Sequence, residues 1–266
     1  FMKMAINPKD GTLYFSHYIP DTATNNKYTI SIRGPYNPSD PWTTFQEIPV
    51  YCEINFEGYY DLEYQKGMVI AEDGTIYFVV PGKIVQVVSP KEIHEYSTNF
   101  LKEDGTADGP RFGNPFDLYV VRPGDVIPGA GSGDLLAIFS LIREFQPHVY
   151  IKKVLLSNGK LQLQDIAEHY LDLEFRDVTR GPDGRLYFLF KSGFPEKEMV
   201  LKRLEASGSF TEVIRNRNYT YEFLGYLTYW PADGAFYMGA IIRGGREDCL
   251  YRVDPRSGNI QPILYT

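Results

Sequence analysis

Four segments of the chain repeat one pattern, an Asp-Gly pair followed by a short strand-like run, and this recurrence limits the fold more than any other feature. The four copies are Asp10-Gly11-Thr12-Leu13-Tyr14-Phe15, Asp73-Gly74-Thr75-Ile76-Tyr77-Phe78, Asp183-Gly184-Arg185-Leu186-Tyr187-Phe188 and Asp233-Gly234-Ala235-Phe236-Tyr237-Met238. A weaker copy, Gly133-Asp134-Leu135-Leu136-Ala137-Ile138-Phe139, lies near the midpoint of the one long interval. A tight hairpin needs a positive φ angle that Gly adopts freely and Asp tolerates. Each Asp-Gly pair therefore predicts a hairpin, and the chain contains five equivalent units.

Each unit is predicted to hold four antiparallel strands, which is the composition of a propeller blade. In the fourth unit these are residues 175–180, 186–190, 199–204 and 210–214, with a turn at Ser207-Gly208-Ser209. In the fifth unit they are residues 224–229, 235–240, 249–253 and 259–264, with a turn at Arg256-Ser257-Gly258. The expected fold is an all-β propeller in one domain, residues 1–266, with five visible blades and a six-bladed parent as the alternative. The expected blades are 1–60, 61–110, 111–170, 171–220 and 221–266.

Composition agrees with strands rather than helices. Aromatic residues make up 15% of the chain, with 21 Tyr and 17 Phe, and such side chains favour the pleated surface of a sheet. Leu161 to His169 could be a short helix, but its alternation fits the fourth strand of the third blade better. Gly34 to Pro38 and Pro123 to Gly133 are predicted loops.

Charge and hydropathy exclude some partners. The net charge of −7 disfavours a nucleic-acid backbone, which is bound by Lys and Arg. Apolar stretches such as Met68 to Ala71 are strand-length, far short of the about 20 residues of a membrane helix. Cys52 and Cys249 lack metal-ligand spacing, so two thiols or one disulfide are both open. The start, Phe1-Met2-Lys3-Met4, lacks a signal-peptide pattern and opens inside a strand pattern, which suggests that upstream residues are missing; a secreted or extracytoplasmic location is favoured but not determined.

One junction resembles a known family. Residues Asp104-Gly105-Thr106-Ala107-Asp108-Gly109-Pro110-Arg111-Phe112-Gly113-Asn114-Pro115-Phe116-Asp117 are similar to the junction that leads into a blade's innermost strand in NHL-repeat propellers, of the six-bladed NHL/TolB-like superfamily. The Asp-Gly hairpins extend a weaker likeness over all five units. This resemblance implies a rigid propeller that binds a protein or a ligand.

A second stretch, Phe175-Arg176-Asp177-Val178 through Leu189, is similar to a blade of the soluble glucose/sorbosone dehydrogenases. In that family an Arg-x-Arg-Asp run contacts pyrroloquinoline quinone, which would carry over to Arg176 and Asp177. Here Glu174 replaces the first Arg, and none of His17, His94, His148 and His169 lies in a matching base motif. Because hydride abstraction from a sugar needs a positioned base, the enzyme interpretation is weakened.

Candidate binding residues are those expected where inner strands begin, at the mouth of the channel. They are Glu63, Tyr64, Arg111, Asp117, Arg176, Asp177 and Tyr226, with Lys3 as a further candidate. The structural alternative for Arg176 and Asp177 is an ion pair or capping bond between blades. Asp104 and Asp108 could hold Ca²⁺, although a turn-capping role is the simpler interpretation, and no other metal site is predicted.

The favoured function is a binding or scaffold module that recognises a protein or small ligand through loops at one face, with enzyme activity the less favoured outcome. The alternatives are a channel-centred enzyme of the quinoprotein dehydrogenase, lactonase or lyase type, or a five-bladed glycosidase. A glycosidase would use Asp117, Asp177 and Glu63 as its carboxylates.

Overall fold

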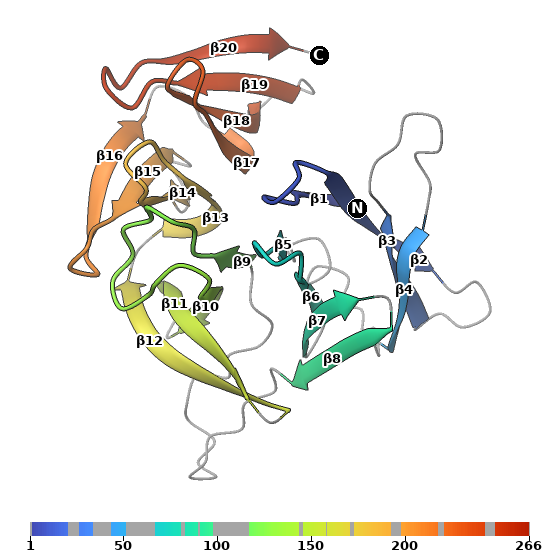
Figure 1. Cartoon of the computed structure of the whole chain (residues 1–266). Helices are drawn as coiled ribbons and strands as arrows, with labels where there is room; N and C mark the ends of the chain where they lie inside the picture. Colours follow the sequence, from blue (N-terminus) through green and yellow to red (C-terminus); the bar gives the residue numbers. More distant parts are fainter. Residues whose placement is uncertain are drawn as a thin grey trace. The chain divides into compact units, whose positions relative to one another are not determined.

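In the computed structural model, the described part of the chain contains twenty β-strands in five antiparallel sheets of four strands each (Figure 1). The structure describes residues 2–20, 27–33, 44–51, 67–80, 83–89, 91–97, 117–143, 146–157, 159–170, 173–192, 198–217, 221–242 and 248–265. These ranges contain no helix. The predicted all-β propeller class, built from four-stranded antiparallel blades, is therefore confirmed.

Within every sheet the strands lie in chain order, so each sheet is a meander that begins with its inner strand. The first sheet holds β1 (Met2–Ile6), β2 (Leu13–Pro20), β3 (Lys27–Arg33) and β4 (Thr44–Tyr51). The second holds β5 (Met68–Ile70), β6 (Ile76–Val80), β7 (Lys83–Ser89) and β8 (Glu92–Ser97). The third holds β9 (Asp117–Val120), β10 (Leu135–Arg143), β11 (Gln146–Ser157) and β12 (Lys160–Tyr170). The fourth holds β13 (Leu173–Arg180), β14 (Leu186–Ser192), β15 (Met199–Leu204) and β16 (Phe210–Asn216), and the fifth β17 (Tyr221–Trp230), β18 (Ala235–Ile242), β19 (Asp248–Val253) and β20 (Ile260–Tyr265).

The predicted strands of the fourth and fifth blades agree with the observed ones to within a few residues at each end. The segment that could have been a helix is β12, a strand, as its alternation indicated. The predicted loop from Pro123 to Gly133 contains no strand. The loop predicted at residues 34–38 lies outside the described residues.

The Asp-Gly pairs are the hairpin turns that the sequence predicted. The glycines of all four full copies have φ between 68° and 92°, a region that L side chains rarely adopt. The preceding Asp accepts a hydrogen bond on its Oδ1 from the backbone N–H two residues further on, for example from Thr75 to Asp73 at 2.9 Å and from Thr12 to Asp10 at 2.9 Å. This local bond closes the turn, which explains why Asp recurs before Gly. The Thr12 bonds also hold the pKa of Asp10 below its usual value.

In the second and fifth blades the tyrosine that follows the Asp-Gly pair shares a hydrogen-bond network with the third strand. In the fifth blade the Tyr237 hydroxyl donates to Asp233 at 2.8 Å, and Arg252 of β19 donates to the same carboxylate oxygen at 2.8 Å. In the second blade Gln86 of β7 takes the arginine's place and donates to the Tyr77 hydroxyl at 3.1 Å. The sequence motif showed the Asp and the Tyr, but not the partner on the third strand.

The chain divides into two compact units, each described here by itself. Unit 1 comprises Phe1–Val120, Gly133–Phe139 and Lys152–Gln164, and unit 2 comprises Val121–Ser132, Ser140–Ile151 and Asp165–Thr266. In unit 1 a core lies between the first two sheets and contains Ile32, Met68, Ile70, Ile76, Phe78, Val85 and Val87. That residues 1–266 form one domain with the stated blade boundaries stays a prediction.

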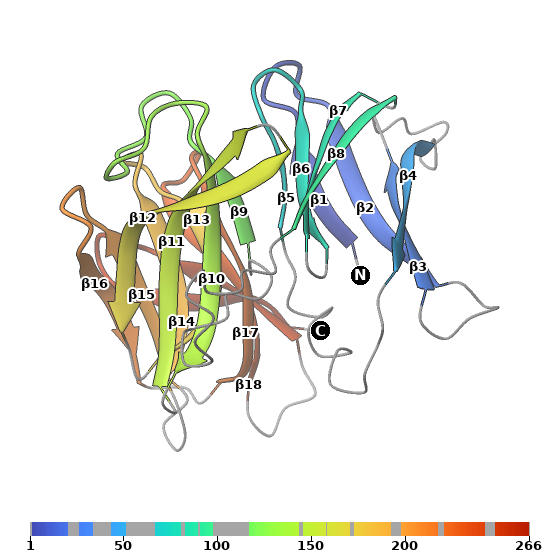
Figure 2. The same ribbon diagram turned by 90° about the horizontal axis from the view of Figure 1, so that it is seen from below.

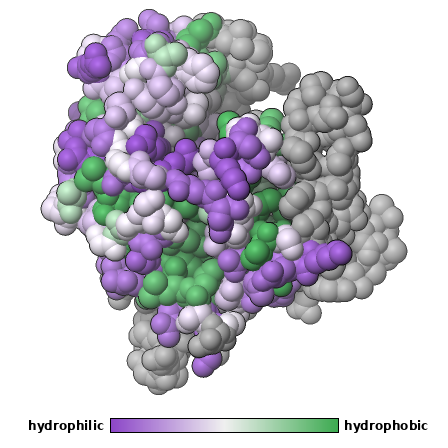
Figure 3. Space-filling model, in the orientation of Figure 1, coloured by the Kyte–Doolittle hydropathy of each residue, from purple (hydrophilic) through white to green (hydrophobic). Residues whose placement is uncertain are grey.

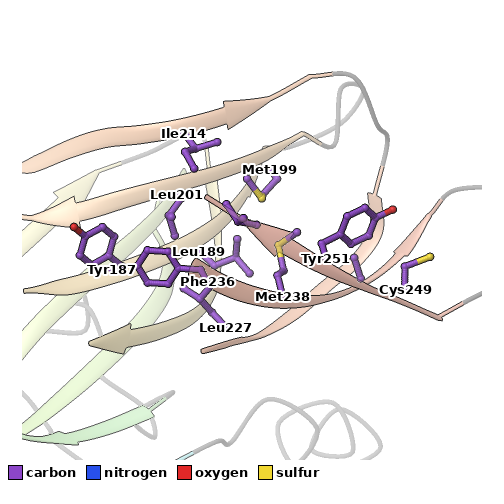
Figure 4. Close-up of a cluster of buried hydrophobic side chains, with 12 residues drawn as sticks. Tyr187, Leu189, Met199, Leu201, Ile214, Leu227, Phe236, Met238, Cys249 and Tyr251 are labelled. Atoms are coloured by element: carbon purple, nitrogen blue, oxygen red, sulfur yellow. The ribbon is translucent and has the colours of Figure 1, made fainter. Parts of the chain in front are cut away.

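The core of unit 2 lies between the fourth and fifth sheets (Figure 4). Side chains from β14, β15 and β16 meet side chains from β17, β18 and β19. Phe236 is fully buried and its ring centroid lies 4.8 Å from that of Tyr187 in the neighbouring sheet. Fully burying a side chain of this size stabilises the fold by about 1.5–3 kcal/mol. Cys249 is buried in the same cluster, while Cys52 lies outside the described residues, so the redox state of the pair stays open.

A glycine-rich loop after β9 is anchored on the β13–β14 hairpin (green in Figure 2). Val126 donates its backbone N–H to the Gly184 carbonyl at 2.9 Å, and Arg180 donates to the buried Asp125 carboxylate at 2.5 Å. A Cβ atom on Gly184 would lie 2.2 Å from the Gly124 carbonyl oxygen, so this approach requires glycine. The loop is thereby held against the base of the inner strand β13.

Hydrophilic residues cover most of the described surface on the face drawn in Figure 3, and apolar residues appear there in smaller groups. None of the described residues belongs to a helix with the length and apolar character that crossing a membrane requires.

Candidate ligand site on the inner strands of unit 2

The inner strands β13 and β17 each carry a β-bulge, and two predicted site residues occupy the bulges. In β13 the register with β14 shifts between Phe175 and Asp177, which leaves Arg176 as the extra residue. In β17 the register with β18 shifts between Gly225 and Leu227, which leaves Tyr226 as the extra residue. Arg176 and Tyr226 stand at the same distance before the Asp-Gly pairs of their blades. The bulge is thus a repeated feature, and bulges commonly re-aim side chains next to functional sites.

Asp177 links the two inner strands. Its side chain is buried, and its Oδ2 accepts a hydrogen bond from the Leu227 backbone N–H at 2.6 Å. Its Oδ1 accepts from the Val178 N–H at 3.0 Å. The bond to Leu227 brings the bulge of β17 beside the bulge of β13. The capping bond between blades, which the sequence left as the alternative for this residue, is present.

Asp117 repeats the local part of this arrangement at the start of β9 in unit 1. It is buried, and its Oδ1 accepts a hydrogen bond from the Leu118 N–H at 2.9 Å. Because an aspartate in this setting satisfies backbone donors, both aspartates serve the sheet structure. Their predicted role in ligand binding stays a prediction.

Arg176 is almost completely buried and forms an ion pair with Glu174 on the same strand. The distance from Arg176 Nη2 to Glu174 Oε2 is 2.5 Å. The Arg176 side chain is 9% exposed and the Glu174 side chain 52% exposed, so the carboxylate faces solvent while the guanidinium lies behind it. Glu174, which breaks the dehydrogenase-like pattern in the sequence, is therefore the counter-charge of Arg176.

Tyr226 has a left-handed backbone and an exposed side chain. Its φ angle is 56°, the one positive φ among the described non-glycine residues, and 65% of its surface is exposed. A residue with a Cβ atom in this conformation is strained by roughly 1–2 kcal/mol. Gly225 and Gly239 face each other beside it, and a Cβ on Gly239 would meet the Gly225 oxygen at 3.3 Å. Glycine at those two positions lets the strands approach closely. The left-handed backbone conformation, however, is adopted by Tyr226 and not by either glycine.

The remaining predicted site residues lie elsewhere in the chain. Glu63, Tyr64 and Arg111 lie outside the described residues, as do Asp104 and Asp108 of the possible Ca²⁺ site. Lys3 is on β1, but its side chain is not among those described. The described residues contain no group of three or more His, Cys, Asp or Glu side chains that could hold a metal ion.

The described histidines lie on β2, β8, β11 and β12 rather than on β13 or β17. His169 of β12 stacks on Phe210 with ring centroids 4.3 Å apart, and its Nε2 lies 3.2 Å from Lys202 Nζ. Burial, with a smaller contribution from Lys202, lowers the pKa of His169 from 6.5 to about 4. Burial also lowers the pKa of Lys202. This cluster was not predicted, because the contact joins strands of different blades.

Together, Glu174, Arg176 and Tyr226 are here called the inner-strand site. They offer an exposed carboxylate, the guanidinium that neutralises it and an aromatic ring. The charged pair can hydrogen-bond with a ligand, and the ring can stack on one. The ring lies beside Gly239 of β18, where a Cβ atom would meet Tyr226 Cδ2 at 3.8 Å. The two inner strands are fixed by strand pairing and by the Asp177–Leu227 bond, so each of these groups lies on a rigid support.

No known family profile matches the chain, and no curated protein matches it in sequence. Among solved structures, a chain of Kuenenia stuttgartiensis hydrazine synthase matches with a TM-score of 0.55 and 14% identity, covering 94% of this chain and 64% of that one. A periplasmic gluconolactonase from Pseudomonas aeruginosa matches with a TM-score of 0.51 and 12% identity, covering 99% of this chain and 84% of that one. An apocarotenoid oxygenase from Synechocystis matches with a TM-score of 0.53 and 9% identity, covering 100% of this chain and 60% of that one.

This chain spans less than two thirds of the hydrazine synthase and oxygenase chains. At these identities the likeness shows the fold alone, and the three proteins have unrelated activities, as is common for a shared fold. The propeller fold is supported, while membership of the NHL family is not confirmed.

Proposed function

We propose that this propeller is a binding module that recognises its ligand at the inner-strand site of unit 2. The observation that carries the proposal is Tyr226, an exposed aromatic residue held at a φ angle of 56°. Strained backbone at a non-glycine residue persists only where surrounding structure enforces it, and it gathers at functional sites. An aromatic side chain in that position supplies contact area at a small loss of side-chain entropy.

The neighbouring contacts favour binding over catalysis by Asp177. Both carboxylate oxygens of Asp177 accept backbone N–H bonds, so this group supports the strands. The likeness of the sequence to NHL propellers, which act as binding scaffolds, points in the same direction. A protein segment and a small ligand both remain within this proposal.

A lactone-hydrolysing enzyme is the second candidate, because one structural neighbour is a gluconolactonase. Its test is direct: hydrolysis of D-glucono-1,5-lactone by the purified chain, followed by pH-stat titration against the uncatalysed rate. Turnover that requires the inner-strand site would replace the binding proposal with this one.

The binding proposal is tested by a thermal-shift screen of defined probes, comprising saccharides, sugar acids, quaternary amines and short peptides, on the wild type and Tyr226→Gly. We expect at least one probe to raise the melting temperature of the wild type and to lose this effect in the variant. Tyr170→Ala is the matched control, because Tyr170 is 51% exposed but lies on the outer strand β12. If no probe distinguishes Tyr226→Gly from the wild type, the inner-strand site is not a binding site.

A further inference from the structure

Two basic side chains of unit 2, His169 of β12 and Lys202 of β15, contact each other directly. The Nε2 atom of His169 lies 3.2 Å from the Nζ atom of Lys202. A hydrogen bond at this distance needs one donor and one acceptor, so the two facing nitrogens do not both donate. Burial lowers the pKa of His169 to about 4, so the imidazole is neutral near neutral pH. The contact therefore places a proton acceptor against an amine.

The surroundings of Lys202 are apolar on the side of the imidazole. Lys202 lies directly opposite Phe188 in the pairing of β14 with β15. The His169 ring stacks on Phe210 with centroids 4.3 Å apart, and the Phe210 and Phe188 centroids are 5.1 Å apart. Burial beside these rings disfavours the ammonium form and lowers the pKa of Lys202 below its usual value.

The carboxylate that could neutralise Lys202 is engaged by another cation. Glu212 lies opposite Lys202 in the pairing of β15 with β16. Its two oxygens accept hydrogen bonds from Arg215, at 2.7 Å from Nη2 and at 3.1 Å from Nε. Glu212 raises and Arg215 lowers the pKa of Lys202, and burial outweighs both. The geometry around Lys202 therefore favours an amine that gives up its proton.

We propose that Lys202 is a nucleophilic amine that accepts an acyl group from a small thioester, with His169 as the base that receives the amine proton. Amines activated by burial and by cationic neighbours act as nucleophiles in this way. Both residues are partly exposed, so a reagent of a few atoms can reach them. This site is separate from the inner-strand site and does not depend on the binding function proposed above.

The reaction consumes only the thioester. The lone pair of Lys202 Nζ attacks the carbonyl carbon and forms the C–N bond. The C–S bond then breaks, and its electron pair leaves with the sulfur. The Nζ proton passes to His169 Nε2 and from there to the thiolate, so the products are an acyl-lysine and a thiol, and the imidazole returns to its neutral form.

The inference is tested by treating the full chain with the neutral thioester S-acetyl-N-acetylcysteamine and locating the acetyl groups by peptide mapping with mass spectrometry. Lys83 is the internal reference, because its Nζ is paired with Glu95 Oε2 at 2.5 Å while its side chain is 48% exposed. We expect Lys202 to be acetylated at least about tenfold faster than Lys83 near neutral pH. Acetylation of Lys202 at or below the rate of Lys83 would overturn the proposal.

Two variants should change the rate at Lys202 in opposite directions, which a general loosening of the structure would not do. His169→Gln removes the base, and we expect the rate to fall by about tenfold. Glu212→Gln removes the charge that raises the pKa of Lys202, and we expect the rate to rise by about threefold. Circular dichroism confirms that each variant is folded, and the rate at Lys83 corrects for reagent concentration. An unchanged rate in His169→Gln excludes the base, and should that variant not fold, an unchanged or lower rate in Glu212→Gln contradicts the proposal.

The pH profile gives a readout that packing alone would not move. The rate at Lys202 should rise with pH and level off at a lower pH than the rate of N-acetyl-lysine methylamide in the same solution, because burial shifts the pKa of Lys202 downward. His169, Glu212 and Arg215 are the charged or titratable groups that act on this amine. If Lys202 levels off at the same pH as the free lysine derivative, its ammonium is solvated and the proposal is wrong.

Discussion

The bulges of β13 and β17 occupy the same place in two consecutive blades, but the residues at the two bulges differ in burial and in backbone strain. Arg176 is buried and paired with Glu174, whereas Tyr226 is exposed and strained. Asp177, the residue after the first bulge, bonds the residue after the second. The same backbone feature therefore stabilises the structure in the fourth blade, whereas in the fifth blade it holds a side chain exposed to solvent. Repeats with equal folds can diverge in this way because function depends on single sites rather than on the fold.

The largest effect is expected from Asp177→Ala. This change removes the carboxylate that accepts hydrogen bonds from the Leu227 N–H and the Val178 N–H. Both N–H groups then lose this acceptor. We expect the free energy of unfolding to fall by about 2–3 kcal/mol, as measured by urea denaturation followed by circular dichroism. Asp117→Ala is the matched comparison in unit 1, because it removes the same local bond to Leu118. A loss below about 0.5 kcal/mol in Asp177→Ala would show that the inner strands do not depend on this link.

The two bulge residues should respond to substitution with opposite signs. Arg176→Ala removes a buried side chain and the partner of Glu174, and we expect a loss of about 1–3 kcal/mol in the free energy of unfolding. Tyr226→Gly places glycine at a positive φ angle, and we expect the free energy of unfolding to rise by up to about 1 kcal/mol. The relief of backbone strain in the folded state exceeds the cost of the greater conformational entropy that glycine gives the unfolded chain. The measurement is urea denaturation of both variants under identical conditions.

Arg176→Lys is the control for Arg176→Ala, because it keeps the positive charge and loses the planar guanidinium group. If Tyr226→Gly destabilises the protein as much as Arg176→Ala does, Tyr226 is a structural residue, and the contrast between the two blades disappears.

The sequence was sufficient for the parts of the fold that depend on local chemistry. The Asp-Gly turns and the alternation in β12 follow from the preferences of a few adjacent residues, so both could be predicted. The bulge positions Arg176 and Tyr226 were singled out because they stand at the start of inner strands. The partner of Asp177 could not be predicted, because the Asp177 carboxylate accepts its hydrogen bond from the backbone N–H of Leu227. Almost every residue type carries a backbone N–H, so the sequence does not mark which residue donates. The positive φ of Tyr226 was hidden for a related reason: Gly225 is adjacent and would be the expected left-handed residue.

The contact between His169 of β12 and Lys202 of β15 offers a third case, a half-buried imidazole that faces an amine. Asp177 and Arg176 are buried with groups that satisfy their charge, whereas His169 lies on Phe210 and faces an amine. Its pKa in the folded protein is about 4, below the value of 6.5 that it has when unfolded. Between these values the unfolded state binds the proton and the folded state does not. The stability contributed by the neutral ring is therefore complete above about pH 6.5 and is lost as the pH falls toward 4.

We expect the melting temperature of the wild type to fall between pH 6.5 and pH 4 by more than that of His169→Gln, which cannot titrate in this range. Differential scanning calorimetry at pH steps across this window gives the two slopes, and the comparison of slopes removes the constant effect of losing the Phe210 contact. Lys202→Met is the companion variant, because it removes the amine that disfavours the charged ring, and it should reduce the slope only in part since burial is the larger cause. Equal slopes in the wild type and His169→Gln would mean that the His169 ring is solvated. Burial on the outer strands would then leave the charge of this ring unsuppressed. On the inner strands, by contrast, buried charged groups are accompanied by compensating bonds.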